Sequence, residues 1–321
     1  MRRAFADALI QVAAENPRVM FLTGDLGFQV FDTFIQRYGP RYLNVGVAEA
    51  QLVCAAAGLA LEGWRPVVYS IASFMTGRAY EQIRISVNYP NLPVVVVGAG
   101  GGYTYAASGV THHAADDLGL MSLLPNMTVV APGDPNEIMQ LFPQLFQLPG
   151  PSYIRVGRFG EKSYTADAPA ALGRARLLRE GERLAMVSTG DIAPVVIQAV
   201  TMLNAEGVYP SVYQMHTVKP LDTAALDRLA EQVETLIIVE EHLPPGGLWT
   251  AVSDWRVRRE RGPALLRLGP PHALVLGNPE RDELRQHLQY DAQSIADACR
   301  AVWHKARGVL TGMAVDAAQQ F

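Results

Sequence analysis

Short runs of apolar residues alternate along the chain with longer segments in which apolar residues recur at helical spacing. In the first half these runs are continuous, rich in β-branched residues and bounded by turn residues, which is typical of strands buried on both faces of a parallel sheet. The predicted strands are 19–23, 67–70, 94–98, 127–131 and 153–156, and the predicted helices are 48–61, 78–88 and 136–148. The pattern predicts an α/β fold with helices on both sides of the sheet.

The alternation lapses into a polar stretch containing Ala, Gly and Pro at about 159–182 and then resumes. We therefore expect two consecutive parallel-sheet α/β domains, with the boundary in this stretch. The expected division is a first domain at 1–160, a linker at 161–182, a second domain at 183–307 and a frayed tail at 308–321. In the second domain the predicted strands are 184–188, 211–215, 236–240 and 265–268, and the predicted helices are 192–205, 223–233, 247–255 and 291–305.

Composition limits the possible functions. The 321 residues are 49% hydrophobic and only 18% charged, so either the two cores are large or part of the surface is buried against other chains. The formal charge of −4 provides no basic field for nucleic acid. Cys54 and Cys299 show no metal-ligand spacing and indicate a reducing compartment. With no signal peptide and no apolar run long enough to span a membrane, we expect a cytoplasmic protein.

The most informative segment is NVGVAE at 44–49, which leads into the almost wholly apolar sequence AAAGLA at 55–60. An acidic residue in the first turn of a helix commonly caps it, because the helix dipole favours negative charge there. The helix that Glu49 opens is expected to be buried, and a carboxyl group at its mouth loses solvation and can hold a proton to donate.

This segment resembles the cofactor-glutamate motif of the transketolase family and of its relative deoxyxylulose-phosphate synthase. In that family the glutamate hydrogen-bonds the aminopyrimidine ring of thiamine diphosphate and promotes loss of the proton from C2 of the thiazolium. The resemblance implies that the chain comprises the pyrimidine-binding domain and the C-terminal domain of a transketolase. It also implies that Glu49 is catalytic and binds the cofactor.

The resemblance extends to other residues that bind the cofactor. LTGDL at 22–26 matches an Asp-containing loop, which would place Asp25 near the cofactor and the subunit interface, although a turn or helix cap explains Asp25 nearly as well. Phe74 follows a strand and matches the aromatic residue that packs on the aminopyrimidine, and a core phenylalanine is its alternative. Tyr80 lies near it on the following helix and is included in the predicted cofactor site.

A glycine-rich loop follows the strand at 94–98. It lacks the third glycine of a dinucleotide-binding motif, because Tyr103 occupies that place, so we reject NAD binding. The next segment, SGVTHH at 108–113, resembles the Gly-x-Thr-His loop of the family, whose histidine faces the substrate and donates to a developing oxyanion. His112 takes that place. His113 is either a second substrate contact or a helix-entry residue, and we expect no metal site here.

Two departures from the family pattern concern substrate recognition. Transketolases carry an aspartate that contacts a sugar hydroxyl where this chain has Ser108, and a histidine where it has Gly100. The substrate is therefore expected to differ from an ordinary pentose phosphate.

Three arginines are candidate anion-binding residues. Arg158 matches the phosphate-binding arginine of the family, Arg155 has a counterpart in the synthase branch, and Arg78 is a third candidate. A guanidinium group suits phosphate because its donor fork is planar and bidentate. An ion-pair role at the joint between the domains is the alternative for Arg155 and Arg158.

Full-length transketolases also carry a diphosphate-binding domain, in which a Gly-Asp-Gly…Asn motif holds Mg²⁺ and the diphosphate. None of the Gly-Asp pairs, at 24–25, 133–134 and 190–191, is followed by glycine. We therefore expect an N-terminal transketolase subunit to supply the Mg²⁺ ligands and to join this chain in an α₂β₂ heterotetramer.

Two further functions compete with a split transketolase that transfers a two-carbon ketol unit. Within thiamine enzymes the chain resembles a deoxyxylulose-synthase-like acyl transferase or the β subunit of a 2-oxoacid dehydrogenase, although the loop around His112 fits transketolase better. A non-catalytic scaffold is disfavoured, because Glu49, Phe74 and His112 occur together.

Overall fold

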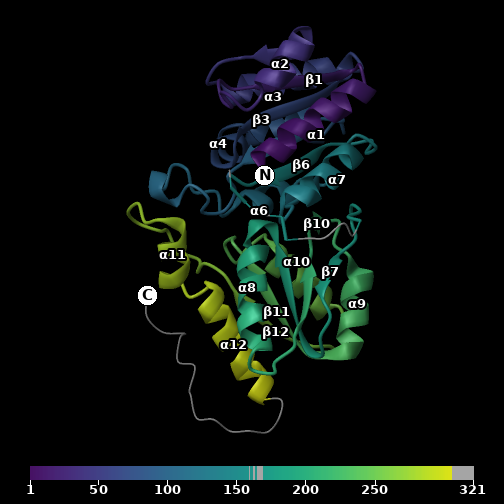
Figure 1. Cartoon of the computed structure of the whole chain (residues 1–321). Helices are drawn as coiled ribbons and strands as arrows, with labels where there is room; N and C mark the ends of the chain where they lie inside the picture. Colours follow the sequence, from purple (N-terminus) through teal and green to yellow (C-terminus); the bar gives the residue numbers. More distant parts are fainter. Residues whose placement is uncertain (159, 162, 165–168, 306–321) are drawn as a thin grey trace.

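Two sheets, each covered by helices on both faces, form two α/β domains stacked end to end (Figure 1). The computed structural model describes residues 1–158, 160–161, 163–164 and 169–305. The predicted tail at 308–321 lies outside the described residues, as does part of the predicted linker. In Figure 1 the first domain runs from purple to teal in the upper half, and the second runs from green to yellow below it.

The first sheet has the order β10-β5-β6-β4-β3-β1-β2. Neighbouring strands are parallel except for β10, which pairs antiparallel with β5. Alternate residues of β1, β3, β4, β5 and β6 point into two separate apolar clusters, as expected for strands buried on both faces. The strands are β1 (Val19–Thr23), β2 (Tyr42–Asn44), β3 (Arg65–Ile71), β4 (Val95–Ala99), β5 (Thr128–Val130), β6 (Ser152–Val156) and β10 (Thr217–Lys219).

Helices cover both faces of this sheet (Figure 1). One face packs against α1 (Arg2–Glu15), α2 (Asp32–Tyr38) and α7 (Pro135–Leu145). The other packs against α3 (Glu49–Leu61), α4 (Ala72–Arg78), α5 (Tyr80–Gln82), a π-helix η2 (Ile83–Asn88) and α6 (Asp117–Ser122). Two short 3₁₀ turns, η1 (Gly39–Arg41) and η3 (Ala106–Ser108), lie in connecting loops.

The second sheet has the order β12-β11-β8-β9-β7, in which only β7 is antiparallel to its neighbour. Helices α8 and α12 pack on one face, and α9 and α10 pack on the other. The strands are β7 (Arg176–Arg179), β8 (Arg183–Thr189), β9 (Ser211–Gln214), β11 (Val233–Glu240) and β12 (Ala264–Leu268). The helices are η4 (Gly190–Ile192), α8 (Ala193–Asn204), α9 (Thr223–Gln232), α10 (Leu248–Val257), α11 (Arg281–His287) and α12 (Ala292–Lys305).

The α/β class and the parallel pairing predicted from the sequence are confirmed, and every predicted strand overlaps an observed one. The helix predicted at 78–88 is wrong at its start, because α4 begins directly after β3 at Ala72. Strand β7 lies inside the predicted linker, and β10 leaves the second domain to join the first sheet. Cys54 and Cys299 are free thiols, exposed on α3 and buried in α12 respectively. No helix among the described residues is long and apolar enough to cross a membrane.

Candidate active site

The candidate site lies where the carboxyl ends of β1, β3 and β4 meet the first turn of α3. Because these strands are parallel neighbours, the loops that follow them emerge at the same edge of the sheet, where open α/β sheets place ligands. Glu49 begins α3, Phe74 lies on α4 directly after β3, and His112 lies in the loop after β4.

Glu49 is buried at the mouth of an apolar helix, with only 3% of its surface exposed. Its Oε1 accepts a hydrogen bond from the Ser70 hydroxyl at 3.1 Å, and its Oε2 lies 3.5 Å from Nη1 of Arg78. Ala48 precedes the helix without a side-chain cap, and the Glu49 carboxylate bonds to β3 and α4 rather than to the helix end. The acid is therefore directed toward neighbouring elements and does not act as a capping residue.

Phe74 and Arg78 lie one turn apart on α4, so they share one face of that helix. The Arg78 guanidinium stacks 4.3 Å from the centre of the Phe74 ring while its tip approaches Glu49. Phe74 also meets the His112 ring edge-on, with the ring centres 5.1 Å apart. A continuous row thus runs from the buried carboxylate through the arginine and the aromatic ring to the imidazole.

The loop that carries His112 is held at several points. Gly102 and Ala114 exchange backbone hydrogen bonds of 3.0 and 2.9 Å, which close the loop between them. Ser73 on α4 donates to the carbonyl of Thr111 at 3.1 Å. The Thr111 hydroxyl lies 2.9 Å from Nδ1 of His112 and orients the ring. Among the described residues, no hydrogen bond reaches the remaining ring nitrogen, Nε2.

Tyr105 completes this row and was not anticipated from the sequence. Its ring centre lies 6.1 Å from that of His112, and the guanidinium groups of Arg2 and Arg158 lie 5.8 and 5.7 Å from its ring. A Cβ at Gly100 would overlap the Tyr105 ring, and Gly100 also has a φ of +74°. The glycine that departs from the family pattern therefore makes room for the tyrosine beside His112.

Arg2 hydrogen-bonds the Tyr105 hydroxyl. The helix that carries it is fixed in place because the Met1 amino group and the Arg2 amide both donate to the Arg158 carbonyl. Two guanidinium groups from opposite ends of the first domain thus flank one phenol beside His112. The position of Tyr105 in the site becomes visible only from its neighbours in space, because no sequence motif marks an aromatic residue in a glycine-rich loop.

Asp25 lies in the loop that follows β1. It has a φ of +60° and exchanges two hydrogen bonds of 3.0 Å with the Asn44 side chain, which also accepts from the Gly46 amide. This pairing ties the β1 loop to the NVGVAE segment and leaves Asp25 exposed. Asp25 can face a ligand or another subunit from this position.

Ser108 is exposed at the end of η3 in the His112 loop. His113 points away from His112, with its ring 5.0 Å from Tyr103 and its Nε2 3.3 Å from the Ala106 carbonyl. Tyr80 packs against the apolar cluster beneath α3 and α4. Among the residues predicted from the sequence, His113 and Tyr80 therefore have contacts outside the row from Glu49 to His112.

Arg155 is 3% exposed, and its guanidinium is occupied. It donates through Nε to Asp117 Oδ2 at 2.9 Å, forms a second bond through Nη2 to the same carboxylate, and donates to the Glu241 carbonyl at 3.3 Å. The structure thus gives Arg155 the ion-pair role at the domain joint and not a substrate-binding role. Arg158, by contrast, is exposed.

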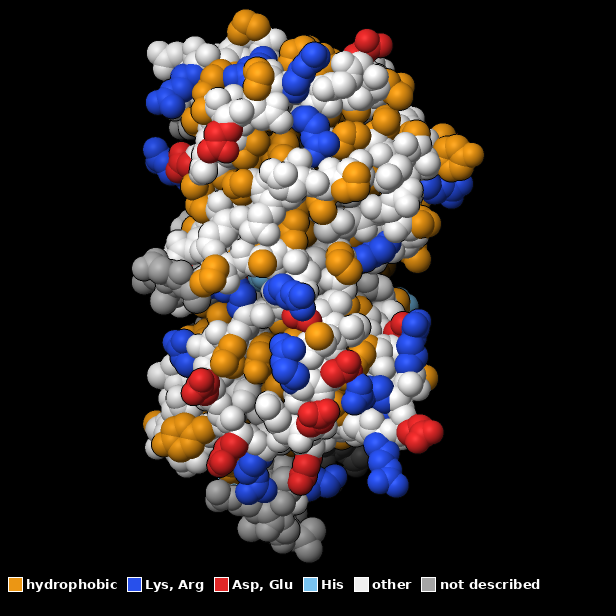
Figure 2. All heavy atoms as spheres, turned by 90° about the vertical axis from the view of Figure 1, so that its right-hand side faces the viewer, with side chains coloured by type: hydrophobic (Ala, Val, Ile, Leu, Met, Phe, Trp, Pro, Cys, Tyr) orange, Lys and Arg blue, Asp and Glu red, His pale blue; other side chains and the backbone are white. Residues whose placement is uncertain are grey.

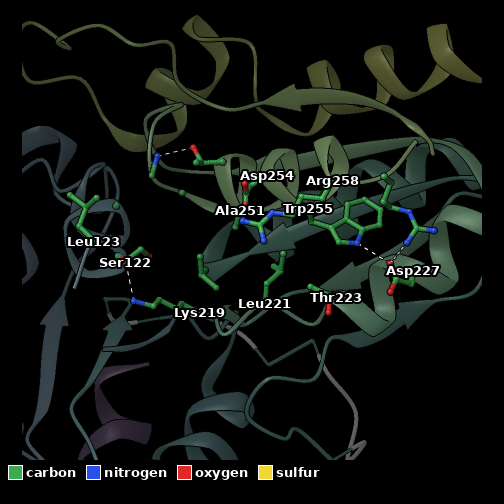
Figure 3. A pocket seen from close by; sticks show the side chains of 16 residues that line it. Ser122, Leu123, Lys219, Leu221, Thr223, Asp227, Ala251, Asp254, Trp255 and Arg258 are labelled. Carbon is green, nitrogen blue, oxygen red and sulfur yellow. Dashed lines mark hydrogen bonds and ion pairs between the residues drawn. The ribbon is translucent and has the colours of Figure 1, made fainter. Parts of the chain in front are cut away.

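A pocket of about 550 Å³ lies elsewhere, between α6 of the first domain and α10 of the second (Figure 3). Lys219 enters it and donates to the Ser122 and Leu124 carbonyls, while Asp227 accepts from the Trp255 indole at 2.9 Å. None of its lining residues belongs to the row from Glu49 to His112. In the part of the chain that the structure describes, no group of three or more His, Cys, Asp or Glu side chains is arranged to hold a metal ion.

Two family models match the chain: "Transketolase, pyrimidine binding domain" at residues 1–159 and "Transketolase, C-terminal domain" at residues 173–295. A putative transketolase C-terminal section of Methanocaldococcus jannaschii is 31% identical over 92% of this chain and 94% of its own length. One subunit of an apulose-4-phosphate transketolase of Actinobacillus succinogenes is 33% identical over 82% of this chain and 85% of its own length.

A second kind of relative is longer. A 1-deoxy-D-xylulose-5-phosphate synthase of Chlorobium luteolum is 33% identical over 91% of this chain, but the match spans only 47% of the synthase. Among solved structures, a split gene transketolase described as an inactive beta4 tetramer superposes with a TM-score of 0.83 at 30% identity. That match covers 94% of this chain and 97% of the other.

Proposed function

The chain belongs to the transketolase family, and from this premise we propose that it is the C-terminal subunit of a thiamine-diphosphate-dependent split transketolase, transferring a two-carbon ketol unit between a ketose and an aldose. The observation that carries the proposal is the buried Glu49 carboxylate, which lies at the head of one row of side chains with Phe74 and His112. When bound, thiamine diphosphate supplies the carbanion chemistry.

Glu49 fits the aminopyrimidine end of that cofactor. The carboxyl group is buried, its Oε1 is fixed by Ser70, and its Oε2 has only a 3.5 Å contact with a largely exposed arginine. A ring nitrogen can therefore take the place of the Arg78 contact at Oε2. Glu49 would hold the proton at that nitrogen, and the half-buried Phe74 ring next to it would stack on the ring.

His112 serves the substrate in this proposal. Thr111 occupies Nδ1 of the ring, so Nε2 is left to donate to an oxygen on which negative charge develops. Arg158, and with it Arg2, would hold an anionic group such as a phosphate on the far side of Tyr105. Ser108, in place of an acid, and Tyr105, in the space that Gly100 leaves open where the family has an imidazole, would then contact the sugar hydroxyls.

The partner subunit is proposed from the surface around the site. Val47, two residues before Glu49, is 71% exposed, and Val110, two residues before His112, is 58% exposed. Figure 2 shows a different side of the molecule, to the right in Figure 1 and away from α4; there hydrophobic side chains are interspersed over the first domain, while charged side chains gather over the second. Exposed apolar residues beside a catalytic centre are typical of a surface that another chain covers. We expect a subunit with the Gly-Asp-Gly…Asn motif to cover it, to bring Mg²⁺ and the diphosphate site, and to form an α₂β₂ heterotetramer.

A second candidate is acyl transfer from a 2-oxoacid, which the match to half of a 1-deoxy-D-xylulose-5-phosphate synthase favours. The two reactions would use Glu49 in the same way and differ in the donor. A ketose donor tests the first and a 2-oxoacid donor tests the second.

Reconstitution tests the proposal. The chain is purified with and without the subunit that carries the Gly-Asp-Gly motif, and each preparation is assayed with thiamine diphosphate, Mg²⁺ and a ketose–aldose pair. We expect ketol transfer only in the mixture. Full activity of the isolated chain would refute the split organisation, and activity of the mixture with 2-oxoacids but with no ketose would favour the second candidate.

A further inference from the structure

The loop that carries His112 is anchored by the second domain. The Tyr103 amide donates to Glu241 Oε1 at 2.8 Å, and the Ala115 carbonyl accepts from the Leu243 amide at 2.7 Å. These two contacts lie just inside and just outside the Gly102–Ala114 bridge that closes the loop. Between them, Ala106 packs with Leu284 of α11. The segment directly after β11 and helix α11 therefore hold the loop at its base and along its side.

Glu241 is the centre of this anchor. It is 1% exposed, and its carboxylate also accepts from Nε and Nη2 of Arg281 at 2.9 and 2.7 Å and from Nε of Arg285 at 2.9 Å. Arg281 in turn donates twice to Asp191 at 2.9 Å. The orientation of the carboxylate is thus fixed by groups of the second domain before it meets the loop.

The first domain is shaped to receive this carboxylate. A Cβ on Gly102 would lie 2.7 Å from Glu241 Oε1 and 2.9 Å from the Glu241 carbonyl, so no side chain fits at this position. Burial alone would raise the pKa of Glu241, but Arg281, Arg285 and the hydrogen bonds lower it to about 2. The two arginines therefore favour the charged form of the carboxylate that accepts from the Tyr103 amide.

We propose that Glu241 is a positioning residue for the active site: by holding the Tyr103 amide, it fixes the loop that presents His112, so that the second domain sets the geometry of the catalytic centre in the first. The inference rests on the proposed function of His112. It gives the C-terminal domain a role in the reaction beyond packing.

The neighbouring residue Glu240 provides a matched control. It is equally buried and is the last residue of β11, but its carboxylate bonds to the Leu248 and Trp249 amides and to Arg267, all within the second domain. Glu241→Asp keeps the charge that Arg281 and Arg285 require and withdraws it by one methylene from the Tyr103 amide. Glu240→Asp makes the same change without touching the loop.

Both variants are assembled with the partner subunit, and amide hydrogen exchange is measured for peptides covering 103–114. We expect exchange in this segment to be about ten- to a hundredfold faster in Glu241→Asp, the range for loss of a hydrogen bond to a charged acceptor, and unchanged in Glu240→Asp. Glu241→Gln serves as a second variant, in which the amide oxygen can still accept from Tyr103 but no longer carries the charge, so we expect a smaller increase in exchange. Equal exchange in wild type, Glu241→Asp and Glu241→Gln would overturn the anchor.

A double-mutant cycle tests the link to catalysis. Glu241→Asp should lower kcat at least tenfold in the wild-type background and change it less than twofold in the His112→Ala background, because the loop then carries nothing to position. Additive losses in the two backgrounds would overturn the positioning role. If the wild-type assembly shows no ketol transfer, the proposed function fails instead, and the exchange data alone decide whether the anchor exists.

Discussion

Glu49→Gln separates the chemistry of the site from its stability. The glutamine is isosteric, and its amide oxygen can still accept the hydrogen bond from Ser70. The contact that is lost is the 3.5 Å approach of Arg78, whose side chain is 56% exposed. Ion pairs of this exposed kind contribute at most about 1 kcal/mol, so the free energy of unfolding should fall by no more than about 1 kcal/mol.

The effect on turnover should be far larger. An amide cannot supply the carboxylic proton, and loss of a positioned proton donor commonly costs about 10²- to 10⁴-fold in rate. We expect kcat of the assembled enzyme to fall by this factor, with a parallel fall in hydrogen–deuterium exchange at C2 of the bound cofactor. Urea unfolding and sedimentation of the assembled complex would show that folding and assembly are kept.

Glu62→Gln is the matched control, because Glu62 lies at the other end of α3 and is exposed. It should leave C2 exchange and turnover unchanged. If Glu49→Gln leaves C2 exchange at the wild-type rate, the reasoning is refuted, and Glu49 is only an acid at the end of a helix.

Four further outcomes are expected. Arg155→Met should lower the free energy of unfolding in urea by about 3–5 kcal/mol, because it leaves the Asp117 carboxylate buried without its charge partner. A stable variant with a raised KM for phosphorylated substrates would instead favour a substrate-binding role for Arg155. Arg158→Ala should raise KM for phosphorylated substrates far more than for unphosphorylated ones, and equal effects on the two substrate classes would show that Arg158 does not recognise phosphate. Ser108→Asp should narrow the range of sugar configurations that the enzyme accepts, and an unchanged range would show that Ser108 does not affect this choice. Burial, and after it the charge of Arg155, lowers the pKa of His242 to about 4. The contribution of this histidine to the stability of the folded protein is therefore present above pH 6.5 and is lost as the pH falls from 6.5 through 4. The free energy of unfolding should be about 2 kcal/mol larger at pH 7.5 than at pH 5 because of this residue, and His242→Gln should remove that difference.

Sequence patterns predicted those parts of the fold that depend on local chemistry. Continuous β-branched runs located the central strands, because strands buried on both faces need apolar residues at every position. Helix α4 was missed at its start because the apolar run of β3 continues into it without a turn residue. Strand β10 has only three residues and pairs with β5, far away in the sequence, so no local pattern marks it.

In the candidate site, too, local motifs were predictable from the sequence and contacts between distant residues were not. The motif around Glu49 and the loop around His112 were recognisable because their chemistry requires specific residues at fixed spacing. The sequence left the choice open between a substrate-binding role and an ion-pair role for Arg155, because its partner Asp117 lies 38 residues away along the chain. Tyr105 was missed because its importance depends on the space above Gly100 and on Arg2, which lies 103 residues away along the chain.

Strand β10 has a consequence for anyone who tries to work with the two domains separately. By pairing with β5, the chain segment Thr217–Lys219 covers the outer edge of the first sheet. A fragment truncated near residue 160 would leave the β5 edge open, with a row of amide and carbonyl groups ready to pair with another copy. Such a fragment should aggregate on expression, and a chimaera that exchanges the second domain would have to carry this strand in register to remain soluble.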